Sequence, residues 1–351
     1  MNRRRSAIPM FISFGCGLVL AAAGLSAGEP SPAALQKLSP RAAKALASAK
    51  LGPLGAVAHP ADNPSTPAKV ELGRLLYFDT RISGDNTISC ATCHDPEVAW
   101  AETDPTSIGI GHKKGPRNSP TVLDSAYYQV FFWDGRASSL EEQALGPIEN
   151  PIEMGMPMGN LLGKLDQVAG YKPLFKSAFG DEKVTADRIA KAIACFERTV
   201  VSGPSAFDEF LAGKADALSE AQVRGLELFL TKAGCMPCHR GPFLTTHQYR
   251  SSNMTDADLG RFDVTKDPAD KRMFRTPSLR HVAMTPPYFH DGSEPSLEGA
   301  VFFRANNVRM QDVKPDTELR LTASEVKDLT RFMESLNGKL PAFQPPTQFP
   351  K

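Results

Sequence analysis

The sequence predicts a mainly α protein built from two related domains, with long loops and few strands. Two C-x-x-C-H pentapeptides, at residues 90–94 and 235–239, each follow an apolar helical segment that contains a glycine, which indicates an internal repeat. Segments with the alternating pattern of strands are sparse, so helices and loops are the main elements. The chain of 351 residues is long enough for two domains of ordinary size.

Helix-start signals occur at three places along the chain. They are the pair Thr66-Pro67, a capping box of Ser219 and Gln222, and a capping box of Thr322 and Glu325. The first two helices lead to the two pentapeptides, and the third is the last helix of the chain. The turn-forming residues Ser202-Gly203-Pro204 mark the border between the domains. We therefore expect one domain at residues 29–203 and the other at residues 204–351.

The C-x-x-C-H pattern is typical of covalent attachment of a c-type haem. Its two cysteines bond the two vinyl groups of one haem, and the adjacent histidine lies beneath the iron as the proximal ligand. The residues that offer this are Cys90, Cys93 and His94, then Cys235, Cys238 and His239. A zinc ion or a disulfide at each site is the alternative, which the histidine directly after the second cysteine disfavours. The sequence thus predicts two cytochrome c-like domains, each with one covalent c-type haem.

The first 28 residues have the order of a secretory signal peptide. Three arginines, Arg3 to Arg5, precede an apolar run at about residues 7–25, and small residues follow as far as Gly28. An uncleaved membrane anchor is the alternative, because the run is close to the ~20 residues that span a bilayer. Covalent haem attachment takes place outside the bacterial cytoplasm, so we expect an exported, periplasmic protein.

The charge balance excludes one class of partner. The chain has 40 Lys and Arg against 39 Asp and Glu, a formal charge of +1. Removing residues 1–28 takes away three arginines and no acid, so the charge falls by three, to −2. This gives no electrostatic reason to expect nucleic acid as a partner.

Five further groups of residues accompany the pentapeptides. They are Gly115-Pro116-Arg117-Asn118, Phe132-Trp133-Asp134-Gly135-Arg136, Asn150-Pro151-Ile152-Glu153-Met154, Phe274-Arg275-Thr276-Pro277-Ser278-Leu279-Arg280 and Tyr288-Phe289-His290-Asp291-Gly292. In this order, the chain strongly resembles the bacterial di-haem cytochrome c peroxidase family, which includes the MauG-type maturation enzymes. The resemblance runs from about residue 62 to residue 338.

The resemblance implies a role for each motif. The N-terminal haem would be the low-potential peroxidatic site, and the C-terminal haem would accept electrons from a small cytochrome c or a cupredoxin. Trp133 would relay electrons between the haems, and Glu153 would act as acid and base above the peroxidatic iron. Asn118, with backbone oxygens near Thr276 and Pro277, would hold a calcium ion. The family also suggests a homodimer.

Chemistry supports the role of Glu153. Cleavage of iron-bound peroxide needs a proton moved from one oxygen to the other, and a carboxylate whose pKa is raised by burial does this well. Glu153 stands among the apolar residues Pro151, Ile152 and Met154, while its rival Glu149 lies four residues away.

Two positions depart from the family pattern. His112 is the candidate for a reversible distal ligand of the peroxidatic iron, although it lies about two residues nearer the Arg-Asn pair than expected; otherwise it is a solvated loop histidine. Arg304 occupies the position of the distal ligand of the C-terminal haem, yet a guanidinium has no lone pair for iron. Met310 is our substitute ligand, with Met284 and His281 as alternatives.

The sequence therefore predicts a periplasmic peroxidase that reduces hydrogen peroxide to water. The alternative is a MauG-like enzyme that oxidises residues of a partner protein, storing oxidising equivalents across both haems. A third hypothesis is a non-catalytic electron carrier, which leaves Glu153 and the Phe-Trp-Asp-Gly-Arg motif without a role.

Overall fold

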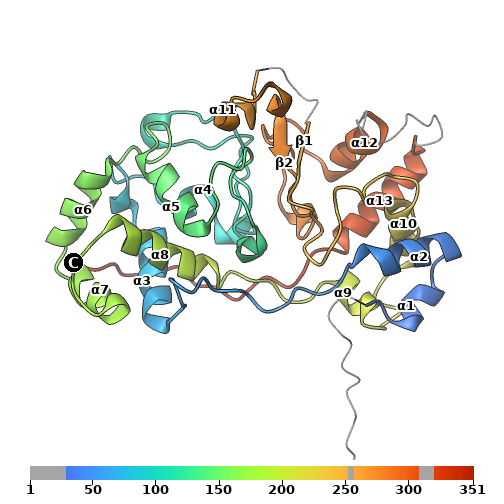
Figure 1. Cartoon of the computed structure of the whole chain (residues 1–351), viewed down its shortest axis with the longest axis horizontal. Helices are drawn as coiled ribbons and strands as arrows, with labels where there is room; N and C mark the ends of the chain where they lie inside the picture. Colours follow the sequence, from blue (N-terminus) through green and yellow to red (C-terminus); the bar gives the residue numbers. More distant parts are fainter. Residues whose placement is uncertain (1–28, 252–256, 308–319) are drawn as a thin grey trace, which may run out of the picture.

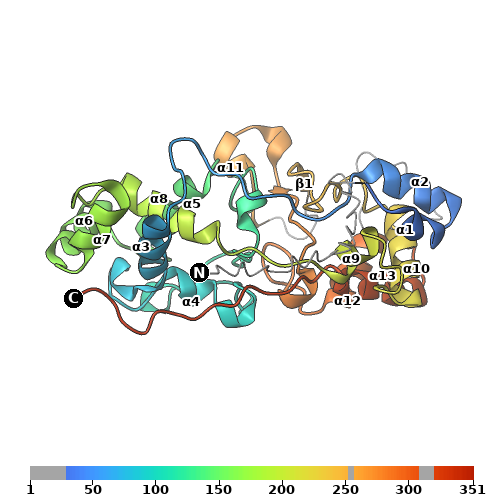
Figure 2. The same ribbon diagram turned by 90° about the horizontal axis from the view of Figure 1, so that it is seen from below.

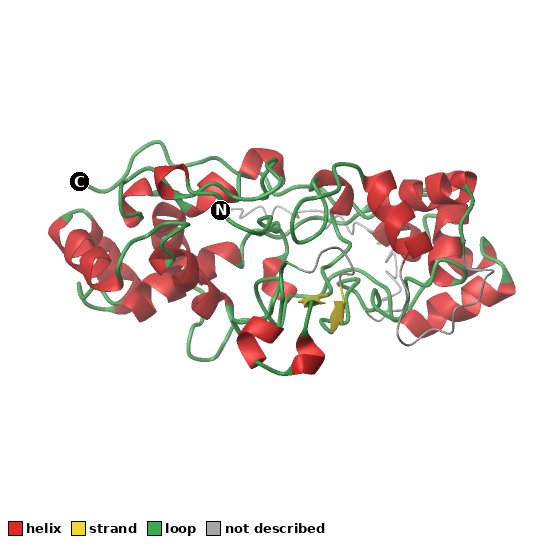
Figure 3. Ribbon diagram, turned by 90° about the horizontal axis from the view of Figure 1, so that it is seen from above, coloured by secondary structure: helices red, strands yellow, loops and turns green. Residues whose placement is uncertain are grey.

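A computed structural model describes residues 29–251, 257–307 and 320–351. The described chain is mainly helical, which confirms the predicted fold class. The molecule is elongated, with helices gathered in a lobe at each end and loops filling the space between them (Figures 1 and 3). The predicted signal peptide and Met310 lie outside the described residues. No helix within those residues is long and apolar enough to cross a membrane.

Most helices of each lobe come from one half of the chain. The lobe that carries the first pentapeptide contains α3 (Pro67–Phe78), α4 (Cys90–Cys93), α5 (Leu140–Glu149), α6 (Met158–Gln167), α7 (Tyr171–Phe179) and α8 (Ala186–Glu197). The other lobe contains α1 (Pro32–Gln36), α2 (Pro40–Ala49), α9 (Ala206–Leu211), α10 (Glu220–Leu230), α12 (Leu297–Asn307) and α13 (Ala323–Glu334). Between them lie α11 (Phe262–Thr265) and the antiparallel pair β1 (Tyr249–Ser251) and β2 (Met273–Arg275) (Figure 1).

The predicted helix starts are confirmed. The Thr66 hydroxyl accepts a hydrogen bond from the Lys69 amide at 3.2 Å, at the start of α3. Both predicted capping boxes are present, at the start of α10 and at the start of α13. These caps satisfy amide groups that have no partner inside the helix, so they fix where each helix begins.

Each lobe is built around a close crossing of two helices that a glycine permits. A Cβ atom at Gly73 of α3 would overlap the carbonyl oxygen of Ala192 in α8, and one at Gly225 of α10 would overlap the carbonyl oxygen of Asp328 in α13. In both lobes the glycine lies in the helix that leads to the C-x-x-C-H motif. The repeat seen in the sequence therefore corresponds to a repeated packing unit.

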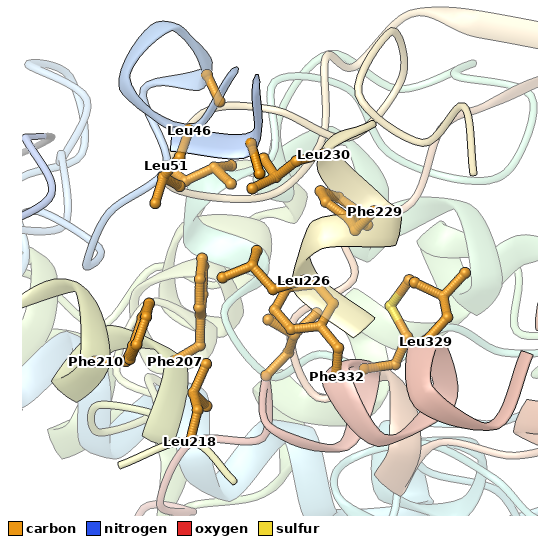
Figure 4. Packing of buried hydrophobic residues seen from close by; sticks show 14 of the residues in the cluster. Leu46, Leu51, Phe207, Phe210, Leu218, Leu226, Phe229, Leu230, Leu329 and Phe332 are labelled. Atoms are coloured by element: carbon orange, nitrogen blue, oxygen red, sulfur yellow. The ribbon is translucent and has the colours of Figure 1, made fainter. Parts of the chain in front are cut away.

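Aromatic rings fill the core of the second lobe. The ring of Phe332 packs there against those of Phe207 and Phe229, and each of the two centroids lies 5.3 Å from the centroid of Phe332 (Figure 4). Leu46 and Leu51, from the beginning of the chain, belong to the same buried cluster. The lead-in helices α1 and α2 are therefore part of this core.

The two ends of the chain are exchanged between the lobes, which changes the predicted domain division. Residues 29–51 pack with the C-terminal lobe, whereas Leu340, Phe343 and Phe349 pack against the core of the N-terminal lobe. The Phe343 ring lies 4.9 Å from that of Trp100, measured between centroids. Three segments therefore run between the lobes (Figures 1 and 2). The border near residue 203 lies on one of them, but both terminal segments belong to the opposite lobe.

Candidate haem sites

The first pentapeptide begins with the single helical turn of α4, which sets Cys90 and Cys93 on one short helix with His94 directly after it. The turn starts at Ser89, whose amide donates to the Thr92 hydroxyl at 2.9 Å. At its end, the Tyr77 hydroxyl of α3 donates to the His94 carbonyl at 3.3 Å. The helix before the motif thus holds the motif itself.

A cavity of about 250 Å³ opens over this motif. It brings together most of the residues that the sequence predicted for the N-terminal site. Its lining includes Cys90, Cys93, His94, Asn118, Trp133 and Glu153. His112 and Glu149 are not among the lining residues.

His94 is suited to bind iron. Burial lowers the pKa of its ring to about 4, so the imidazole is neutral at physiological pH and keeps a lone pair. Its Nδ1 atom is buried and has no hydrogen-bond partner among the described residues. The two cysteines and the neutral histidine that line this cavity are the residues that a c-type haem requires.

In the second motif, His239 is likewise suited to bind iron, and its Nδ1 atom also has a hydrogen-bond partner. The Nδ1–H of His239 donates to the carbonyl of Leu244 at 2.9 Å, which fixes the tautomer and leaves Nε2 with its lone pair. Burial, helped by the charge of Arg304, lowers the pKa of His239 to about 4. The residues around Cys235 and Cys238 therefore fit a second haem.

Glu153 faces the first cavity from the loop after α5. Its Oε1 atom accepts a hydrogen bond from the Asn150 amide nitrogen at 2.7 Å. Burial raises the pKa of Glu153, against the opposing charge of Arg136 and the Asn150 hydrogen bond. Glu149, in contrast, is exposed at the end of α5. Of the two acids, only Glu153 lines the cavity.

Trp133 lies where the first cavity meets segments from the C-terminal half. Its indole N–H donates to the Asn118 carbonyl at 2.9 Å. Its ring centroid is 6.5 Å from that of His290, edge to face, and His290 in turn stacks on Phe274 at 4.0 Å. These contacts fix the indole between the two halves of the chain.

Comparison with known proteins identifies the family. A family model described as di-haem cytochrome c peroxidase matches residues 67–216. The methylamine utilization protein MauG of Methylorubrum extorquens is 39% identical over 292 residues, which cover 81% of this chain and 82% of that protein. Cytochrome c551 peroxidase of Pseudomonas aeruginosa is 38% identical over 294 residues, with 81% and 82% covered. The chain belongs to the di-haem cytochrome c peroxidase family. It is an oxidoreductase of the cytochrome-c peroxidase type, and membership implies two haems.

The solved structures agree with this fold. The crystal structure of a MauG-like protein associated with microbial copper homeostasis is 32% identical, with a TM-score of 0.73 over 81% of this chain and 93% of that one. The di-haem peroxidase BthA of Burkholderia thailandensis superposes with a TM-score of 0.68 at 24% identity, over 79% and 87% of the two chains.

The predicted calcium residues of this family member lie on linked segments. Asn118 donates from its side chain to the Asp104 carbonyl at 3.1 Å, which orients the amide and leaves its oxygen as a possible ligand. Its own carbonyl holds Trp133, whose carbonyl accepts from the Arg275 amide at 2.7 Å, directly before Thr276 and Pro277. The Thr276 carbonyl already accepts the Thr245 hydroxyl at 2.7 Å. Calcium binding at this site stays a prediction.

His112 lies on the exposed side of its loop. Its backbone has φ near 59°, next to Gly111 with the same φ. The loop is anchored at Ile110, whose amide donates to the Glu153 carbonyl at 2.8 Å, and His112 does not line the cavity. Ligation of iron by His112 therefore requires the loop to move, and it stays a prediction.

The structure excludes one of the candidate distal ligands of the C-terminal haem. His281 is excluded, because its Nε2 donates to buried Asp124 at 2.8 Å and its Nδ1 accepts from the Gly338 amide at 3.2 Å. Arg304 lies with its guanidinium 4.8 Å from the centre of the Phe289 ring. Met284 is half-buried beside His281. The Met310 assignment stays a prediction outside the described residues.

Four charged residues of the first cavity had no predicted role: Arg117, Arg136, Glu197 and Arg275. Glu197 follows the apolar residues 192–196 of α8, and an acid on that buried face was a signal that sequence reasoning missed. Burial raises the pKa of Glu197 from 4.5 to about 8. The charge of neighbouring Arg198 offsets the effect of burial only in part, and Arg198 itself pairs with Glu141 at 2.7 Å.

We expect Glu197 to make the protein less stable as pH rises. The folded state keeps a proton on Glu197 up to about pH 8, whereas the unfolded chain releases it near pH 4.5, so stability falls between these values. The contribution is about 1.4 kcal/mol per pH unit. Glu197→Gln should flatten this part of the pH profile in denaturant unfolding at pH 6 and pH 8. Parallel profiles for the variant and the wild type would contradict the prediction.

Proposed function

We propose that the protein is a periplasmic peroxidase that reduces hydrogen peroxide to water at the N-terminal haem. Two electrons and two protons convert one peroxide into two water molecules, and a small cytochrome c or a cupredoxin supplies the electrons singly through the C-terminal haem. The observation that carries the proposal is the position of Glu153, whose carboxyl lines the same cavity as Cys90, Cys93 and His94. An electron carrier does not need an acid there.

The haem, when bound, supplies the redox centre at which the oxygen–oxygen bond breaks. Thioethers from Cys90 and Cys93 would hold it, together with the His94 ring; Cys235, Cys238 and His239 would hold the other haem. Glu153 would take a proton from one oxygen of hydrogen peroxide and deliver it to the other, which leaves as water. Asn150 keeps one carboxylate oxygen in place, so the other is free to move the proton.

Electrons reach the first cavity through the region of Trp133. Its indole is fixed by Asn118 and packs edge to face on His290, a residue of the C-terminal half. A calcium ion held by Asn118 and the backbone oxygens of Thr276 and Pro277 would stiffen this junction. The family resemblance also favours a homodimer.

A MauG-like activity, in which residues of a partner protein are oxidised, is the second candidate. Arg304 stands where peroxidases of the family are expected to carry a methionine, and the Nε2 atom of His281 is hydrogen-bonded to Asp124. Haem potential depends strongly on the axial ligand, so a C-terminal haem without methionine suits storage of oxidising equivalents better than uptake of electrons.

Stopped-flow spectroscopy separates these activities. The half-reduced, calcium-loaded protein is mixed with hydrogen peroxide, with and without a reduced small cytochrome c. We expect rapid, repeated oxidation of the cytochrome. A long-lived oxidised species that ignores the cytochrome would favour the MauG-like activity, and no reaction with peroxide would leave only an electron carrier. Cell fractionation tests the periplasmic location.

A further inference from the structure

We infer that Arg275, a residue of the C-terminal half, binds a propionate carboxylate of the haem in the N-terminal cavity. Both halves of the chain would then contribute residues to the binding site of the peroxidatic haem. This inference rests on the haem of the proposed N-terminal site, but not on turnover of peroxide.

Arg275 is the last residue of β2, yet it reaches into the cavity over the first pentapeptide. Only 3% of its surface is exposed. Its guanidinium carbon lies 3.8 Å from the centre of the Tyr128 ring, and its Nε donates to the Phe132 carbonyl at 3.3 Å. Its Nη1 atom is also buried, but it has no hydrogen-bond partner among the described residues. Because buried donors are normally hydrogen-bonded, this Nη1 atom indicates an acceptor that is supplied by a ligand.

Of the arginines that line the cavity, Arg275 has no acidic partner among the described residues. Three arginines line it: Arg117, Arg136 and Arg275. Arg117 pairs with Asp134 at 2.6 Å and with Asp258 at 2.7 Å, and Arg136 shares Asp134 at 2.9 Å. Within the described residues, no carboxylate lies in ion-pair distance of Arg275. A buried guanidinium without a counter-charge is costly, so the site is built for an anion that enters with the ligand.

A haem propionate is the anion that fits. Guanidinium groups match carboxylates with two parallel hydrogen bonds, and haem carries two propionates. Hydrogen peroxide is uncharged at neutral pH and does not need a cation. The acids Glu153 and Glu197 also line the cavity, but neither forms an ion pair with Arg275 among the described residues. The propionate is therefore the ligand that supplies the missing charge.

Arg275 would also set the position of the haem relative to Trp133. Its amide donates to the Trp133 carbonyl at 2.7 Å, so one residue provides both the side chain that holds the propionate and a hydrogen bond to the backbone of Trp133. Arg275 is in this sense a positioning residue. Its positive charge near the haem favours the reduced state, because reduction adds negative charge.

The test is the reduction potential of each haem in Arg275→Gln, measured by spectroelectrochemistry on the protein with both haems and without peroxide. We expect the equilibrium constant for reduction of the N-terminal haem to fall at least tenfold, which is about 59 mV. The C-terminal haem should keep its potential. Wild-type potentials for both haems in Arg275→Gln would overturn the inference. Turnover plays no part in this readout, so failure of the peroxidase proposal is recognised separately.

Arg261→Gln is the matched control. Arg261 also comes from the C-terminal half, lies 3.9 Å from the centre of a tyrosine ring, that of Tyr249, and donates to the Asp134 carbonyl at 3.1 Å. It does not line the cavity, so its loss should leave both potentials unchanged. If Arg275→Gln does not accumulate with both haems, Arg275→Lys decides: an altered propionate bending mode in the resonance Raman spectrum supports the inference, and an unaltered mode overturns it.

Discussion

Glu153→Gln is expected to lower peroxide turnover by about 100-fold to 10,000-fold, the range that general acid–base catalysis contributes. The amide has nearly the same size and keeps the contact with Asn150, but it cannot take a proton from peroxide. Both haems should remain bound, because Glu153 is not part of either C-x-x-C-H motif. Turnover is measured with a reduced small cytochrome c, and haem content by the absorption of the denatured haemochrome.

The matched control is Glu149→Gln, which removes the same charge from an exposed position outside the cavity. It should turn over at the wild-type rate. The pH profile gives a second check: because Glu153 must be ionised to accept the proton, and burial raises its pKa, the wild-type rate should fall as pH decreases through that raised value. Near wild-type turnover in Glu153→Gln would remove this residue from the mechanism.

The sequence predicted the local features of this protein well. A capping box depends on residues close together in the chain, so Ser219 and Gln222 could be assigned from their neighbours in the sequence alone. The family motifs located Trp133 and Glu153 in one site, and the cavity contains both.

Contacts between distant segments were beyond sequence reasoning. Phe343 packs against Trp100, more than half the chain length away, and no local pattern announces this exchange of terminal segments. Histidine is a common haem ligand, so His281 was a reasonable candidate. Its Nε2 is instead hydrogen-bonded to Asp124, from the other half of the chain. Arg275 belonged to a recognised motif, but only the fold shows that it enters the cavity of the opposite lobe.

These long-range contacts share a location, the region where the lobes meet. Asp124 accepts from His281 of the C-terminal half and from the amide and hydroxyl of Ser202, at 2.8 to 2.9 Å. Gly203 is held by the Lys339 carbonyl at 2.8 Å. The connecting segments are thus tied by hydrogen bonds, which suits a protein whose two redox centres must keep a fixed separation.

Arg280→Met is expected to destabilise the protein by about 3 to 5 kcal/mol, the effect of removing one partner of a buried ion pair. Arg280 and Asp208 are both almost fully buried and are joined by two bonds of 2.9 Å. Burial alone would raise the pKa of Asp208, but the bonds to Arg280 hold it below its ordinary range. Arg280 also donates to the carbonyls of Gly52 and Pro242, at 2.7 and 2.8 Å. It therefore ties the lead-in segment to the loop that follows His239.

Denaturant unfolding of the holoprotein, followed by far-UV circular dichroism, measures this loss. Arg224→Met breaks a similar two-bond pair with Asp328, but Arg224 is exposed, so the expected cost is only about 0 to 1 kcal/mol. Replacing both buried partners, with Arg280→Met and Asp208→Leu together, should recover part of the stability because no uncompensated charge remains. If Arg280→Met is no more destabilising than Arg224→Met, the buried pair does not hold these segments together. A double variant less stable than Arg280→Met would show instead that the carboxylate is stabilised by Ser205, which donates to it at 2.8 Å.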